Sequence, residues 1–220
     1  MKIRVAIITS LLVVTAFVAP AAADGGKFSL GLRAARAVPF GTAGDGWNLN
    51  ELTTVGAPLQ IDADYRVGDN WRLGAYFSVA PLKIADEAKS SLQGLGLSKV
   101  GGHCQQRVGL QVAYDFRPQA RFSPWVAVGA GYEWTRYAAA TLPTGMETEI
   151  GMGGLDAALQ VGGSYKVTSR FAIGPYAAFD LGRFGRNVRW EEGGDATSSK
   201  ILEKGTHQWV RFGVKVGYSF

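Results

Sequence analysis

The sequence predicts an all-β fold, an eight-stranded antiparallel up-and-down β-barrel that crosses a membrane. Three observations support this prediction. Eight stretches alternate apolar residues with polar or small ones, the connections between them are alternately short and long, and each stretch carries an aromatic residue on its apolar face at the short-connection end. Strands of membrane barrels alternate in this way because one face contacts lipid and the other faces the lumen.

The last stretch shows the alternation most clearly. Side chains on a strand change face at every residue, so Val210, Phe212 and Val214 share one face while Arg211 and Lys215 share the other. The apolar face continues to the terminal aromatic residue. The same alternation predicts strands at residues 28–34, 59–66, 71–79, 107–116, 122–134, 155–166, 171–182 and 210–220.

The connections provide an independent signal. Short turns near Asp69, Gln119 and Ser169 alternate with four long segments, at residues 39–56, 83–106, 138–153 and 185–207. Outer-membrane barrels have tight periplasmic turns and long external loops, and an even strand number places both termini in the periplasm. We therefore expect four extracellular loops, an asymmetry that a soluble lipocalin-like barrel does not require.

Aromatic residues indicate which face meets lipid. At the short-turn end they are Phe28, Tyr65, Trp71, Tyr114, Phe116, Phe122, Tyr165, Phe171, Tyr218 and Phe220, and at the other end Phe77, Tyr132, Trp134 and Phe179. Aromatic rings favour the two bilayer interfaces. In a soluble barrel these rings would point inward, and eight strands enclose too little volume for them. The charged face is therefore predicted to be the interior.

One residue conflicts with a regular strand. Pro175 lies inside the seventh predicted strand and has no N–H group to donate to a neighbouring strand. In a closed barrel without edges, this predicts a bulge or a local break at Pro175.

The first 23 residues have the layout of a secretory signal peptide. Lys2 and Arg4 precede an apolar block at residues 5–18, and three alanines precede Asp24. The block is too short to span a bilayer as a helix. We therefore expect a signal peptide at residues 1–23 and a barrel domain at residues 24–220. Loss of Lys2 and Arg4 changes 23 basic and 18 acidic residues to 21 and 18, a net charge of +3 that gives no argument for nucleic acid.

Together, these features resemble one family. The signal peptide, the alternating strands, the segment Ser-Pro-Trp-Val-Ala-Val-Gly-Ala-Gly-Tyr at residues 123–132 and the terminal Tyr218-Ser219-Phe220 are similar to the small outer-membrane β-barrel proteins of Gram-negative bacteria, of the OmpA, OmpX and OmpW type. The resemblance is one of pattern over the whole mature chain. It implies that the barrel-assembly machinery reads the C-terminal strand, with Tyr218 and Phe220 as the assembly signal.

Inward-facing positions carry charges of both signs in nearly equal numbers. They are Arg33, Asp62, Asp64, Arg66, Arg72, Arg107, Asp115, Glu133, Asp156, Lys166, Asp180, Arg211 and Lys215. An isolated charge in a narrow lumen costs several kcal/mol, so these ions must be paired or hydrated. We expect a salt-bridged network that fills the lumen, because eight strands leave an interior about filled by side chains. A thin, gated ion path through the same charges is the alternative.

The histidines and the cysteine give little indication of catalysis. His103 and His207 both fall near the outer ends of strands, where a lipid hydrolase could act, but the lipid A deacylase pattern His-x-Ser is absent at both. Two histidines on unrelated loops are too few for a metal site, and nothing beside Cys104 marks an activated thiolate. We therefore expect no catalysis, no cofactor and no metal, with a lipid-modifying enzyme as the third reading.

These inferences predict a structural or surface-interaction protein of the outer membrane. The expected partners are outer-membrane lipid, lipopolysaccharide and, during biogenesis, the barrel-assembly machinery, and we expect a monomer. The last long segment, which contains Arg189, Trp190 and Lys200, could contact lipopolysaccharide or a partner, although a solvated loop also explains it. A passive narrow channel for small or apolar solutes is the alternative, because fold alone does not decide function.

Overall fold

The computed structural model describes residues 27–44, 46–94, 96, 98–101, 103–141, 147–191 and 197–220. The predicted signal peptide at residues 1–23 lies outside the described residues. Among the helices in the described ranges, none is long and apolar enough to cross a membrane.

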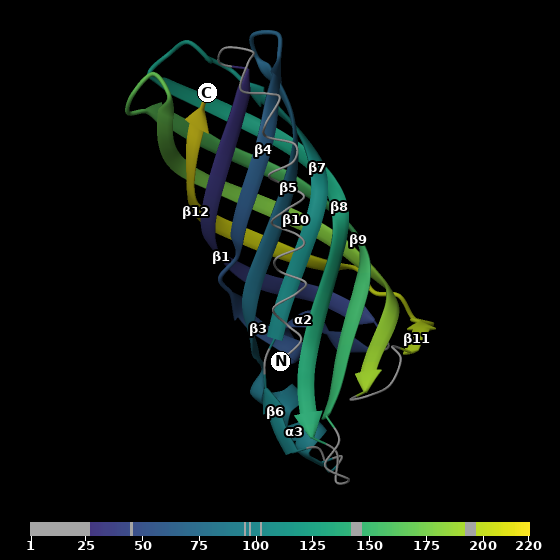
Figure 1. The fold of residues 1–220 in the computed structure, drawn as a ribbon. Helices are drawn as coiled ribbons and strands as arrows, with labels where there is room; N and C mark the ends of the chain where they lie inside the picture. Colours follow the sequence, from purple (N-terminus) through teal and green to yellow (C-terminus); the bar gives the residue numbers. More distant parts are fainter. Residues whose placement is uncertain are drawn as a thin grey trace.

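Eight long strands form a closed ring (Figure 1). They are β1 (Phe28–Gly44), β4 (Leu59–Val67), β5 (Trp71–Ile84), β7 (His103–Asp115), β8 (Phe122–Thr141), β9 (Glu147–Lys166), β10 (Phe171–Glu191) and β12 (His207–Ser219). Each pairs antiparallel with the next, and β12 pairs with β1 to close the ring. The predicted eight-stranded up-and-down barrel is confirmed.

The register of the pairs fixes the tilt of the strands. A path that starts at Ile173 on β10 and follows paired residues around the ring returns to β10 at Arg183, ten residues farther along. The intermediate pairs run through Val216, Leu32, Ile61, Phe77, Val108, Tyr132 and Leu155. A displacement of ten residues across eight strand spacings corresponds to a tilt of about 40° from the barrel axis.

The two ends of the barrel differ, as predicted. At one end, here called the turn end, short connections join β4 to β5, β7 to β8 and β9 to β10. At the same end β1 begins and β12 ends. At the opposite end, here called the loop end, β8, β9 and β10 are 20, 20 and 21 residues long. The predicted strands at residues 122–134, 155–166 and 171–182 are too short at the loop end, because strand pairing needs only backbone N–H and C=O groups and continues where the apolar alternation stops.

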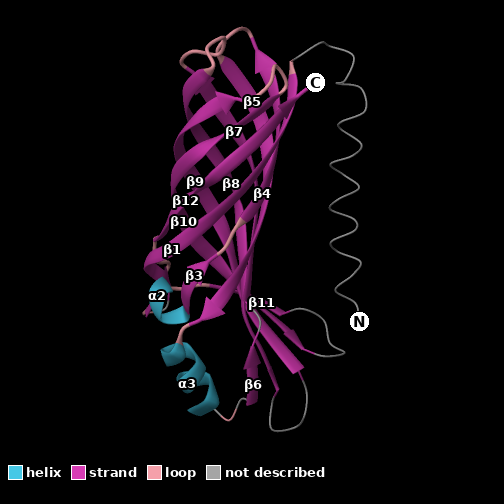
Figure 2. Ribbon diagram, turned by 90° about the vertical axis from the view of Figure 1, so that its left-hand side faces the viewer, coloured by secondary structure: helices cyan, strands magenta, loops and turns pink. Residues whose placement is uncertain are grey.

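The remaining long segments contain short elements at the loop end. They are β2 (Trp47–Asn48), α2 (Leu49–Leu52), β3 (Thr53–Gly56), α3 (Asp86–Gly94), β6 (Ser98–Gly101) and β11 (Thr197–Lys200). Figure 2 shows α3 and β6 beyond the loop end of the barrel. In α2, the side chain and the backbone N–H of Asn48 donate hydrogen bonds to Glu51 at 2.8 and 3.1 Å, and they lower the pKa of the Glu51 carboxyl.

Burial follows the predicted parity of the strands. Leu110 and Leu155 are more than 70% exposed on the outer face, whereas Arg33 and Asp62 are at most 1% exposed on the inner face. A water-soluble protein buries its apolar residues, so this inversion identifies the outer wall as a lipid-contacting surface. Ring contacts join Trp71 to Tyr114, Tyr114 to Phe116 and Tyr218 to Phe220 at the turn end. Phe28 is the exception in this belt, since it is buried and packs against Phe220 at 5.6 Å.

Pro175 produces a local break and no bulge. On one side, Pro175 keeps its place opposite Val214 of β12. On the other side, Ile173 pairs with Tyr165 and Tyr176 with Gly162 in one register, while Gly174 and Pro175 between them have no partner in β9. Since the register is unchanged, the missing N–H of proline interrupts the pairing without displacing the strand.

The outer face of β12 yields a test of the membrane assignment. Val214 is 46% exposed on the lipid-facing wall, so Val214→Arg places a charge in the apolar band and is expected to cost about 2 to 4 kcal/mol. The measurement is urea unfolding of the protein folded into lipid vesicles, with Val214→Leu as a near-neutral control. Cooperative folding of the wild-type protein in lipid-free buffer would refute the assignment.

Candidate functional site

The lumen is the candidate functional site, because it collects the thirteen charged residues singled out in the sequence. Eleven of them are buried inside the ring, with side chains no more than 10% exposed. Arg66 and Lys166 are half-buried at the turn end. The Lys166 ammonium donates to the carbonyl of Pro118 at 2.6 Å.

At the turn end, the network is centred on Arg72. Its guanidinium binds both carboxylate oxygens of Asp115, at 2.9 and 2.8 Å, and one oxygen of Asp64 at 2.9 Å. Lys215 then links Asp64, at 3.5 Å, to Asp62, at 3.2 Å. Bidentate contacts between arginine and carboxylate are both strong and directional, so this part of the lumen has a defined geometry.

In the middle of the barrel, Arg33 reaches across the lumen. Its Nε lies 2.6 Å from Asp62, and its two terminal nitrogens donate to the side-chain carbonyls of Gln160 and Gln111. The guanidinium also lies over the rings of Trp125 and Tyr176, at 5.4 and 5.3 Å from their centroids. These partners come from β4, β7, β8, β9 and β10, so one side chain on β1 cross-links most of the ring.

Toward the loop end, the network continues through Arg211 and Arg107, which share Asp180. Arg211 binds Asp180 through Nε and Nη2, at 2.6 and 2.7 Å, and donates to Gln60 at 2.9 Å. Arg107 bridges Asp180, at 2.8 Å, to Asp156. Gln60 also donates to Asp62 at 2.7 Å, which joins the two halves. Polar contacts are therefore continuous from Asp115 at the turn end to Asp156.

Glu133 and His207 form a separate polar pair nearer the loop end. Glu133 accepts hydrogen bonds from Gln105 at 2.8 Å and Thr135 at 3.3 Å, and lies 3.3 Å from the Nε2 of His207. The imidazole stacks on Phe184 with 4.0 Å between centroids. Both side chains are at most 1% exposed, so no substrate reaches this pair in the closed structure.

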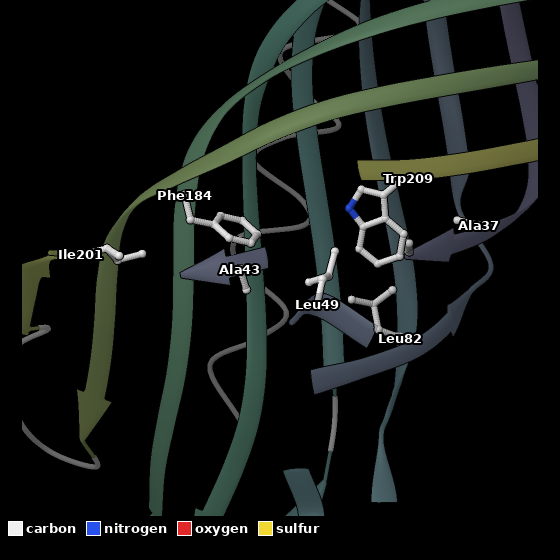
Figure 3. Packing of buried hydrophobic residues seen from close by; sticks show 8 residues of the cluster. Ala37, Ala43, Leu49, Leu82, Phe184, Ile201 and Trp209 are labelled. Carbon is white, nitrogen blue, oxygen red and sulfur yellow. The ribbon is translucent and has the colours of Figure 1, made fainter. Parts of the chain in front are cut away.

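An apolar cluster closes the loop end of the lumen (Figure 3). Trp209 and Phe184 point inward from β12 and β10, and Leu49 of α2 packs against them. Ile201 and Leu82 complete the buried set together with three alanines. The barrel therefore holds a charged section that ends in an apolar cap, to which α2 contributes Leu49.

The turn end is less tightly filled. A cavity of about 100 Å³ lies there, lined by Arg66, Arg72, Asp115, Lys166 and Lys215 among others. It lies on the turn-end side of the Arg72 and Lys215 contacts, so the paired charges separate it from the rest of the lumen.

The other chemically suggestive residues are His103 and Cys104, which are consecutive in β7. His103 begins β7, paired with Leu82, and its side chain lies outside the described set. Cys104 is a half-buried free thiol on the outward parity of β7, between Pro81 and Arg136. Within the described ranges, no three histidine, cysteine, aspartate or glutamate side chains are placed to hold a metal ion.

Sequence reasoning missed the neutral partners of the charges and the cap. The parity of the strands places Gln60, Gln111 and Gln160 on the inward face, but the predicted network contains only the charged residues. Phe184 and Trp209 also keep the inward parity of their strands, but both lie just outside the predicted strands at residues 171–182 and 210–220. The burial of Leu49 depends on the path of α2 over the barrel end, for which the sequence carries no periodic signal.

The closed ring, the lipid-facing outer wall and the charged interior define an outer-membrane β-barrel protein. A family model described as the autotransporter beta-domain matches residues 40–220. The chain therefore belongs to the autotransporter β-domain family. None of the curated proteins compared with it matches the sequence.

Solved structures with the same fold are outer-membrane proteins. The Neisserial surface protein A is 18% identical, with a TM-score of 0.53 over 88% of this chain and 97% of that one. A major outer membrane protein from Thermus thermophilus is 14% identical, with a TM-score of 0.54 over 87% and 99%. OprG from Pseudomonas aeruginosa is 13% identical, with a TM-score of 0.50 over 89% and 96%. At these identities the likeness concerns the fold, and it agrees with the family resemblance and outer-membrane location inferred from the sequence.

The Arg107 to Asp156 pair yields a stability prediction. Asp156 has no hydrogen-bond donor besides Arg107 in the described structure, so Arg107→Met leaves a buried carboxylate unpaired and is expected to cost about 3 to 5 kcal/mol. The double variant Arg107→Met/Asp156→Asn should recover part of that loss. Urea unfolding in vesicles measures both, with the outward-facing Arg183→Met as control. A cost below about 1 kcal/mol, within the range of a surface ion pair, would mean that water reaches the carboxylate and that the lumen is open.

Proposed function

We propose that the protein is a non-catalytic surface-interaction protein of the outer membrane, in which a rigid closed barrel presents four loops to the cell exterior. The supporting observation is the filled lumen. Paired charges extend from Asp115 to Asp156, and the cluster around Trp209 closes the loop end. A barrel without an open interior acts through the surfaces that it displays, and loops on a rigid scaffold are the usual place for binding residues.

The proposal includes an orientation. The loop end faces the cell exterior, and both termini lie on the periplasmic side. The asymmetry of the connections supports it, because barrels of this type have short turns on the periplasmic side. Lipopolysaccharide then surrounds the loop end, and the barrel-assembly machinery meets the strand that ends with Tyr218 and Phe220.

A passive channel is the second candidate, and one observation favours it. The cavity beside Arg66 and Lys166 opens the lumen from the turn end, so a path would require only that the central ion pairs and the cap move. Against this, Arg33 alone contacts partners on several other strands of the ring, and its displacement would break several buried contacts together.

Conductance separates these two candidates. The closed barrel is expected to give no reproducible current steps when the purified protein is inserted into planar bilayers. The variant Trp209→Ala/Phe184→Ala, which removes the two large rings of the cap, and the variant Arg33→Ala serve as comparisons. Regular steps from the wild-type protein would establish the channel instead. Steps from the cap variant alone would show that the cap is the barrier.

Accessible epitopes test the orientation. Gly94 ends α3 beyond the barrel and is exposed, so an epitope inserted after Gly94 is expected to be labelled by antibody on intact cells. An epitope in the turn at residues 168–170 should be labelled only after permeabilisation, if that insertion folds at all, because this turn sets the register of β9 and β10. The reverse pattern of labelling would invert the proposed topology.

A further inference from the structure

The outer wall of the barrel has a hollow beside the first residue of β4. At the loop end, β4 stops at Leu59 and the short strand β3 takes its place between β1 and β5, paired to β1 only at Ala37 and Gly56. A hollow of about 400 Å³ lies in this gap. Its apolar lining includes Val55, Ala57 and Pro81.

Two cations line the same hollow. Arg36 of β1 and Lys83 of β5 both lie on the outward parity of their strands and both are exposed. Among the described residues, neither side chain has an ion pair or a hydrogen bond, although the carboxylates of Asp86 and Glu87 begin α3 just after Lys83. The hollow therefore combines apolar walls with two unneutralised positive charges.

Arg36 lies within the apolar band of the wall and not beyond it. Ala34 precedes it and Phe40 follows it on the outward face of β1, with Phe40 47% exposed. Its direct partner across the strand pair is Phe212, which is 61% exposed. A lipid-facing arginine is unfavourable unless its side chain reaches the interface or binds an anion. The hollow beside Arg36 offers space for such an anion.

We propose that this hollow binds the phosphate-bearing head group of an outer-leaflet glycolipid, with Arg36 and Lys83 on the phosphate and the apolar lining against the adjoining lipid chain. Arginine matches the planar, two-pronged geometry of phosphate oxygens, and lysine adds a point charge. The assignment to the outer leaflet rests on the orientation proposed above. One lipid would then bind at a defined position, whereas the rest of the outer wall contacts lipid without a specific site.

The test measures lipid binding to the refolded full-length exported protein in detergent micelles by native mass spectrometry. The probes are lipid A with two phosphates and the same lipid A with both phosphates removed, and inorganic phosphate is added as a competitor. Variants are Arg36→Gln, Lys83→Gln and the double change. The matched control is Arg183→Gln, since Arg183 is also an exposed outward arginine but does not line the hollow. The heat-induced shift in gel mobility confirms that each variant is folded.

The phosphorylated lipid A is expected to bind at least about tenfold more tightly than the dephosphorylated form, and the double variant should lose that preference, a change of about 1.4 kcal/mol. Arg183→Gln should bind as the wild type does. If the double variant does not fold, Lys83→Gln alone should lose a severalfold part of the preference, because Lys83 is exposed and its loss leaves the wall intact.

Three results would overturn the proposal. Equal binding of both lipids would reduce the hollow to an apolar groove. An equal loss in Arg183→Gln would assign the binding to diffuse positive charge. Displacement of lipid A by millimolar inorganic phosphate would indicate a site for the free anion. Because these readings are taken in micelles, they do not depend on conductance or on loop labelling, so failure here is distinguishable from failure of the proposed function.

Discussion

The pairing of charges inside a narrow ring is the constraint on which this structure depends. Eight strands at this tilt leave a lumen that side chains must fill, and most of the outward face contacts lipid, so most of the charged residues of the strands lie inside. Once inside, each ion requires partners, because an unpaired buried charge is strongly destabilising. Arg33, Arg72, Arg107 and Arg211 meet this requirement by bridging carboxylates and amides from several strands. The interior thus cross-links the wall instead of merely occupying it.

The apolar cap adds a different type of closure at the loop end. Trp209, Phe184 and Leu49 are buried at the loop end of the ring. His207 stacks on Phe184 between this apolar cluster and the charged section of the lumen. Apolar packing stabilises through area removed from water and tolerates small movements, whereas charge pairs require fixed directions. The lumen therefore combines a rigid centre with an end whose packing is less directional, and this end carries the loops.

The sequence specified the wall of this protein more completely than its contents. Alternation predicted every long strand and the correct face of residues such as Val214 and Lys215, since a period of two leaves no choice once one face must be apolar. It also placed the charged residues in the lumen, but it could not pair Arg33 with Asp62 or Arg107 with Asp156, because those contacts depend on the shear of the ring. The local effect of Pro175 and the burial of Leu49 likewise depend on neighbours that are remote in the chain. The hollow beside Arg36 is not predictable from the sequence for the same reason, as it arises where β3 replaces β4 between β1 and β5.

The ten-residue displacement around the ring has a consequence for how faithfully the barrel assembles. A slip of one residue between two strands would turn apolar side chains inward and is rejected by the membrane itself. A slip of two residues keeps every side chain on its proper face, so lipid cannot detect it. The lumen can, because such a slip shifts every inward side chain by two positions against its neighbours; between β1 and β4 it would move Arg33 from opposite Gln60 to opposite Asp62 or Pro58. A two-residue slip would thus have to be rejected by the fit of the lumen and not by the lipid-facing wall.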